Sequence, residues 1–87
     1  MISCSQYDYI EIVCLYKYPV QLTLTSGDMV LGKALDTQRN SDAQECILLL
    51  TEQRKELSEQ EKVLIVLDDI RQLKVTIANP HFTTINF

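Results

Sequence analysis

The sequence predicts a mainly β domain: a small antiparallel barrel or sandwich of five to six strands, with room for a seventh, preceded by one N-terminal α-helix. Two observations favour this fold class. Residues 20–25 alternate between apolar and polar side chains, and residues 29–36 continue a period of two after a short turn, which is the period of half-buried strands. Further short runs of strand-forming residues follow, separated by turn residues. With 87 residues, 46% of them hydrophobic, we expect a single domain over residues 1–87 with one core.

The helix is expected over residues 6–16. Ser5 and Asp8 have the spacing of a capping box, which favours a helix start at this point. Pro19 ends the helix, because proline disfavours helical geometry in the residue before it. By helical spacing, one face carries Ile10, Val13, Cys14 and Lys17, and another carries Asp8, Glu11 and Leu15. Two roles are compatible: the helix caps one end of the sheet, and its acidic, tyrosine-bearing face contacts a partner.

A long bent hairpin follows the helix. In its first strand Val20, Leu22 and Leu24 point to one side, and the polar residues between them point to the other. Residues 26–28, Ser-Gly-Asp, supply a turn. The second strand runs from Met29 to Asp36. Gly32 within it marks a sharp bend or the close approach of another backbone.

The rest of the chain is expected to add strands to this hairpin. Residues 37–44 are polar and predict a loop, and residues 45–52 predict a strand that is buried on both faces. Residues 53–61 are dense in charge and predict a solvated loop or a short helix. Further strands are expected at residues 62–67, 73–77 and 83–85. The predicted core consists of Leu22, Leu24, Leu48, Leu50, Ile65 and Val75.

Charge and hydropathy restrict the classes of function. Twelve acidic and eight basic residues give a net charge of −4, whereas nucleic-acid binders usually present a basic face. An acidic domain is better suited to a basic protein surface. No apolar run approaches the roughly 20 residues of a membrane span. The N-terminus lacks the features of a signal peptide. We therefore expect a cytoplasmic protein that does not bind or span a membrane.

The sequence offers little catalytic or metal-binding chemistry. Cys4, Cys14 and Cys46 form an odd set and predict free thiols. The single histidine, His81, has no ligand spacing with them, so no metal site and no cofactor are expected. There is no nucleophile elbow, phosphate-binding loop or zinc-protease motif. Asp68 and Asp69 are adjacent and predict a turn rather than an acid/base pair. We therefore expect a protein that is not an enzyme.

Several segments together resemble a known family. They are the two-cysteine helix with Tyr7-Asp8-x-Ile10-Glu11, the Leu22-Thr23-Leu24 strand, the Leu67-Asp68-x-Ile70 corner and the segment that begins at Pro80. The helix followed by bent strands is similar to an Sm-like barrel. The combination is similar to the Rho-binding antiterminators (Rof, also called YaeO). Three positions depart from that family: Ser5-Gln6 stand where an acidic residue is usual, and Tyr9 stands where asparagine is usual.

The resemblance implies a bacterial inhibitor of the transcription termination factor Rho. Such proteins bind the RNA-binding N-terminal domain of Rho and block loading of the transcript. We expect the free protein to be a monomer without direct affinity for nucleic acid. The residues expected to contact Rho are Tyr7, Asp8, Tyr9 and Glu11 on the helix, and Arg39, Asn40 and Ser41 in the loop. The alternative is an Sm-like RNA-binding subunit of a ring. Against it, residues 68–72 are acidic and lack the Arg-Gly pair that is usual after the fourth strand of such proteins.

Overall fold

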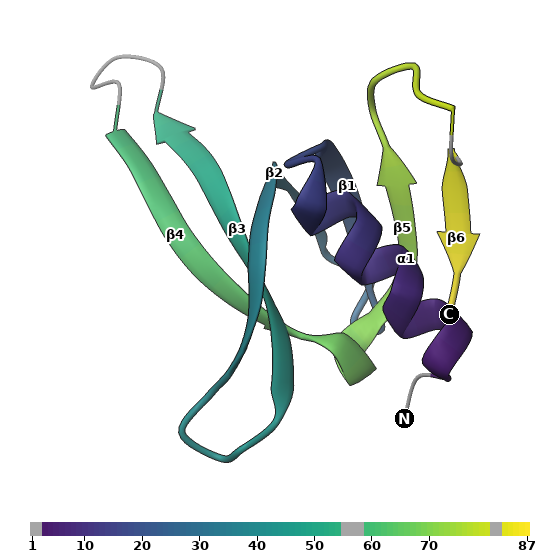
Figure 1. Cartoon of the computed structure of the whole chain (residues 1–87). Coiled ribbons are helices and arrows are strands. Elements are labelled where there is room, and N and C mark those ends of the chain that lie inside the picture. The colour runs from purple at the N-terminus through teal and green to yellow at the C-terminus, as the bar shows by residue number, and fades with distance from the viewer. Residues whose placement is uncertain (1–2, 55–58, 81–82) are drawn as a thin grey trace.

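The computed structural model describes residues 3–54, 59–80 and 83–87 (Figure 1). Its helix, α1, spans Cys4–Leu15 and starts two residues earlier than predicted. The N-cap is Ser3: its Oγ accepts a hydrogen bond from the Gln6 N–H at 3.2 Å, and Gln6 Oε1 accepts one from the Ser3 N–H at 2.8 Å. The capping box predicted at Ser5 and Asp8 is therefore wrong. The longer Gln6 side chain makes the reciprocal bond that completes the box at Ser3.

Six strands form one antiparallel sheet, which confirms the predicted fold class. The sheet order is β4-β3-β2-β1-β5-β6. Figure 1 shows the sheet strongly curled, with the β3–β4 hairpin on one side of α1 and β5 and β6 on the other. A 3-10 turn, Leu67–Asp69, joins β4 to β5. The strands are β1 Pro19–Leu24, β2 Met29–Arg39, β3 Glu45–Arg54, β4 Glu59–Val66, β5 Ile70–Val75 and β6 Thr84–Asn86.

The central hairpin, β1–β2, has the turn that the sequence predicts. Gly27 has a φ of 93°, a conformation that glycine adopts without a Cβ penalty. Gly32 meets the backbone of β3: a Cβ built on it would lie 3.0 Å from the carbonyl oxygen of Leu50. The predicted close approach of a neighbouring strand at Gly32 is thus confirmed. The absence of a side chain at this position lets β2 and β3 approach each other.

Two predicted loops are shorter than expected, because strand pairing continues into polar sequence. Residues 37–39 remain in β2 and pair with residues 45–47 of β3, so the loop begins only at Asn40. Residues 53–54 belong to β3 and residues 59–61 to β4, where a solvated loop was predicted. Backbone hydrogen bonds determine these strand ends, and side-chain polarity alone did not reveal them. Residues 55–58 of the predicted loop, and His81, lie outside the described residues.

The core lies between α1 and the inner face of the sheet, defined as the face that α1 covers. Leu22 and Val75 are buried in it, as predicted, whereas Leu24 and Ile65 are half-buried against it. Leu48 and Leu50 are half-buried and were wrongly assigned to the core. The leucine and isoleucine side chains of β3 that are fully buried are instead those of its inward residues Ile47 and Leu49, both with no exposed surface. A shift of one residue in a strand exchanges its two faces.

The structure shows the state and the burial of the three cysteines. All three are free, as the sequence predicts: Cys14 and Cys46 are buried, and Cys4 is exposed. No helix in the described part of the chain is long and apolar enough to cross a membrane.

Candidate functional site

The outward face of α1 carries the acidic residues that the sequence singled out. Ile10 and Val13 are fully buried and fix the rotation of the helix on the sheet. Asp8 and Glu11, three residues apart, then share one exposed face. Neither carboxylate has an ion-pair partner within the described part of the chain. Their negative charge is therefore presented to solvent.

A hollow of about 760 Å³ lies between this helix face and β2. Its rim holds three carboxylates, those of Asp8, Glu11 and Asp36. The one ammonium group in it, Lys17 Nζ, donates a hydrogen bond to the carbonyl oxygen of Leu35 at 3.3 Å. The remaining lining is mainly apolar and consists of Ile12, Cys14, Leu15, Leu35 and Thr37. An aliphatic side chain that ends in a positive charge would suit this hollow.

The thiol of Cys14 reports the electrostatic character of this hollow. Its pKa is raised from 9.0 to about 11, mainly by burial; the carboxylates of Asp36 and Glu11 act in the same direction, and Lys17 opposes them. Because desolvation disfavours the thiolate and the two acidic groups repel it, the thiol stays protonated at neutral pH. A group of this kind is a structural residue, not a nucleophile.

A second hollow, of about 490 Å³, lies on the other side of Asp8. It is formed by the first half of α1, the end of the β2–β3 loop and the 3-10 turn. Glu45 and Asp68 add two more acidic residues beside Asp8, and the remaining lining is Cys4, Tyr7, Ala43, Gln44 and Leu67. Asp8 lines both hollows and thus joins them into one acidic surface. We define the acidic face as Asp8, Glu11, Asp36, Glu45 and Asp68.

The structure brings only some of the predicted site residues to the acidic face. Tyr7, Asp8 and Glu11 line its hollows. Tyr9 lines neither of them, because one residue further along a helix turns the side chain by about 100°. The sequence did not identify Asp36, Glu45 and Asp68 as members of this site. They lie on three different elements, and only the fold places them near α1.

The predicted loop residues have different roles. Arg39 forms an exposed ion pair with Glu45 at 3.8 Å, which stabilises the loop little. Asn40 organises the loop: its Oδ1 accepts hydrogen bonds from the N–H groups of Asp42 at 2.9 Å and Gln44 at 3.0 Å. Ser41 is exposed at the turn. The end of this loop lies beside α1, where Ala43 and Gln44 line the second hollow, but none of the three predicted loop residues lines it.

The acidic face has the residue types that bind cations but not the arrangement of a metal site. Among residues 3–54, 59–80 and 83–87, no three or more histidine, cysteine, aspartate or glutamate residues converge on a point that could hold a metal ion. The carboxylates are spread over two hollows instead. Such a spread suits several separate cationic groups on one surface better than a single ion.

Comparison with known protein families and with solved structures gave matches that cover nearly the whole chain. The model of the protein family described as "Modulator of Rho-dependent transcription termination (ROF)" matches residues 1–87. Among solved structures, this chain is similar to YaeO from Vibrio cholerae O395, solved bound to magnesium. The two share 44% sequence identity over 94% of this chain and 97% of that chain, with a TM-score of 0.79. The comparison with curated protein sequences found no match.

Proposed function

Since this chain belongs to the ROF family of modulators of Rho-dependent transcription termination, which are non-enzymatic regulators, we propose that it inhibits Rho by occupying its RNA-binding N-terminal domain. Bound there, the protein blocks loading of the transcript. The contact surface is the acidic face together with Tyr7 and the β2–β3 loop. Such an inhibitor acts in the cytoplasm, where transcription takes place in bacteria.

The observation that supports this proposal is the position of Asp8 between two hollows that both carry carboxylates. A surface that binds RNA presents cations to phosphate groups. The acidic face offers negative charges spread over α1, β2, β3 and the 3-10 turn, so it can compete with phosphates for several such cations at once. Complementary charge also raises the rate of association and lowers affinity for other acidic surfaces.

The same charges argue against the alternative of an Sm-like RNA-binding subunit. A transcript that approaches α1 meets Asp8, Glu11 and Asp36, and the net charge of the chain is −4. Phosphates are repelled by this side of the molecule. Binding to a basic protein surface uses the same carboxylates favourably.

The experiment that tests the proposal is inhibition of the RNA-stimulated ATPase of purified Rho. We expect the protein to reduce this activity, and we expect added RNA to relieve the inhibition, because both ligands compete for one surface. Inhibition that added RNA leaves unchanged would contradict occupancy of the RNA-binding domain.

Charge reversal locates the contact. Asp8→Lys/Glu11→Lys should weaken binding to Rho, mainly through slower association. Raising the salt concentration should weaken the parent more than this variant, since the variant retains fewer attractive charges to be screened. Both side chains are exposed, so the fold should survive.

A matched control carries the same change of charge elsewhere. Asp28→Lys/Asp69→Lys alters two exposed carboxylates near the β1–β2 turn and should inhibit Rho almost as the parent does. If the Asp8/Glu11 variant folds normally and inhibits Rho as well as this control, the contact surface lies elsewhere on the molecule.

A further inference from the structure

The side of the sheet turned away from α1 carries exposed apolar residues. Met29 and Leu31 on β2 are 59% and 62% exposed, and neither belongs to the core. Met29 has one weak polar contact, with Gln21 Nε2 at 3.9 Å from its sulfur atom. Two large apolar side chains that lie two residues apart on one strand form a continuous apolar strip.

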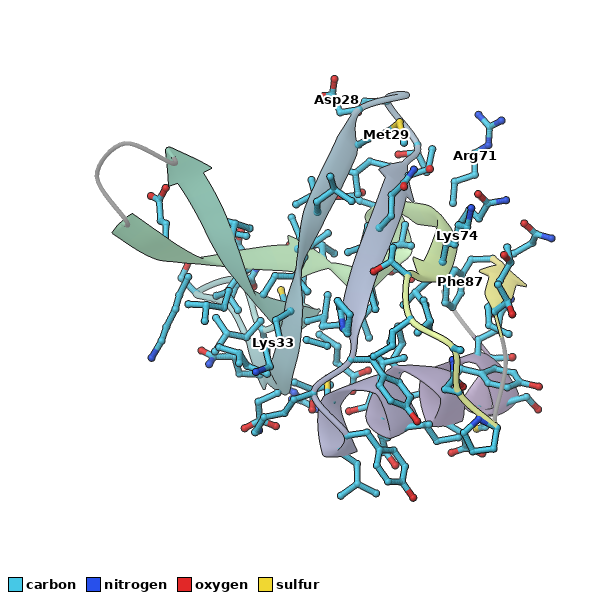
Figure 2. All side chains as sticks on the ribbon, turned by 90° about the horizontal axis from the view of Figure 1, so that it is seen from above. Asp28, Met29, Lys33, Arg71, Lys74 and Phe87 are labelled. Carbon is cyan, nitrogen blue, oxygen red and sulfur yellow. The ribbon has the colours of Figure 1, made fainter. Side chains whose placement is uncertain are left out.

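Strand register places basic residues beside this strip. Gln21 of β1 pairs with Leu31 on one side and with Lys74 of β5 on the other, so Leu31 and Lys74 lie in one row about 10 Å apart. Arg71 is exposed on the same strand as Lys74. Lys33 lies two residues after Leu31 on β2, but Figure 2 shows it toward the α1 end of the molecule, apart from Met29, Arg71 and Lys74. We define the outer sheet face as Met29, Leu31, Arg71 and Lys74.

This face is basic although the whole chain is acidic. In Figure 2, Met29, Arg71 and Lys74 lie at the end of the molecule that is far from α1. The acidic residue next to the strip, Asp28, accepts a hydrogen bond from the Ser26 hydroxyl at 3.1 Å. A small hollow of about 310 Å³ adjoins the face and is lined by Thr23, Arg71, Gln72, Asn86 and Phe87. No aspartate or glutamate side chain lines it, and it could receive one side chain of a partner.

The outer sheet face and the acidic face lie on opposite sides of the sheet. Leu22 and Leu73 share the core with Ile10 of α1, whereas their neighbours Gln21 and Lys74 point to the other side. The helix side combines Asp8 and Glu11 with the exposed apolar residues Leu15 and Tyr16. One side of the molecule is therefore acidic and apolar, and the opposite side is basic and apolar.

We propose that copies of this chain associate head to tail, with the outer sheet face of one copy bound to the acidic α1 face of the next. The two faces complement each other in charge, and each offers apolar area to bury. A symmetric contact between two outer sheet faces would place basic residues opposite basic residues, which repel each other. RNA is a poorer occupant, because the strip consists of methionine and leucine rather than exposed aromatic residues on which bases stack.

This association deepens the proposed function, and its effect on inhibition rests on the proposal that the acidic face binds Rho. If the acidic face binds Rho, a second copy bound there shields it, so self-association competes with inhibition. The contact is heterologous, so it does not stop at a dimer but lengthens with concentration. It differs from the monomer expected from the sequence, because only the fold shows that the two charges are on opposite sides.

Sedimentation velocity of the full-length protein, without Rho, tests the association itself. At an ionic strength of about 0.02 M the mean sedimentation coefficient should rise steadily with protein concentration, and at about 0.5 M it should not. Asp8→Lys/Glu11→Lys and Arg71→Glu/Lys74→Glu should each remain monomeric at low salt. A mixture of the two should associate again, because each supplies a face that the other lacks.

The Asp28→Lys/Asp69→Lys variant is the matched control, since it has the same net charge as the Asp8/Glu11 variant and changes no residue of either face. It should associate at least as strongly as the parent, because Asp28→Lys adds a positive charge beside the outer sheet face. Leu31→Thr, which keeps every charge and a strand-forming residue, should reduce association by itself. A parent that is monomeric at every concentration in low salt, an Arg71/Lys74 variant that associates like the parent, or a mixture that stays monomeric would each overturn the proposal. Because Rho is absent from this measurement, its outcome is independent of whether the protein inhibits Rho.

Discussion

Truncation of two neighbouring leucines in β3 tests the register of the sheet. Leu49 is fully buried in the core, and Leu48 is half-buried on the opposite face. Leu49→Ala removes buried methyl groups and leaves a cavity, which should lower the free energy of unfolding by about 2–5 kcal/mol. Leu48→Ala loses only part of its contacts and leaves no closed cavity, so we expect a loss of about 1 kcal/mol.

Urea unfolding followed by circular dichroism measures both losses. For a domain of this size the dependence of stability on urea is about 1 kcal/mol per M, so a loss of about 3 kcal/mol lowers the midpoint by about 3 M. The two variants have the same composition, strand and chemistry of change, so each is the control for the other. Equal losses, or a larger loss for Leu48→Ala, would show that the register of β3 is wrong.

Three further predictions concern local features. Gly32→Ala should lower the free energy of unfolding by about 1–3 kcal/mol, because the new methyl group meets the Leu50 carbonyl oxygen at 3.0 Å; an unchanged or higher urea midpoint would contradict this. Ser3→Ala should lower the free energy of unfolding by about 1 kcal/mol through loss of the N-cap, while Ser5→Ala should have little effect. A larger loss for Ser5→Ala than for Ser3→Ala would support the capping box first expected at Ser5. The folded state holds the Cys14 proton up to a pKa of about 11, above the ordinary value of 9.0, so the stability from this group should be complete below pH 9 and should fall as pH rises from 9 to 11. In Cys14→Ala, measured by urea unfolding over the same pH range, that part of the decline should be missing.

Local patterns in the sequence were enough to predict the class of the fold. Alternation in residues 19–36, turn chemistry at Gly27 and the break at Pro19 each act through neighbouring residues, so they can be read without a partner strand. Gly32 was also informative, because a glycine inside a strand pattern typically marks a bend or the close approach of another backbone. The acidic residues of α1 followed from the helix period once the buried residues Ile10 and Val13 were recognised.

Only the folded chain shows which face of β3 is inside. Residues 47–50, Ile-Leu-Leu-Leu, are apolar at every position, so the sequence has no alternation there from which the inner face could be read. The inner face is determined by strand register, because Leu49 pairs with the buried residue Ala34 of β2. The ends of β2, β3 and β4 likewise depend on backbone pairing between polar residues, which leaves no mark on the hydrophobic pattern.

The full candidate site also required the fold. Asp36, Glu45 and Asp68 are far apart in the sequence, and nothing local distinguishes them from other surface carboxylates. They lie around Asp8 because the curled sheet brings β2, the start of β3 and the 3-10 turn to the same helix. The separation of acidic and basic residues onto opposite sides is equally invisible in a net charge of −4. Local chemistry thus fixed which elements form, and long-range packing fixed which of their charges act together.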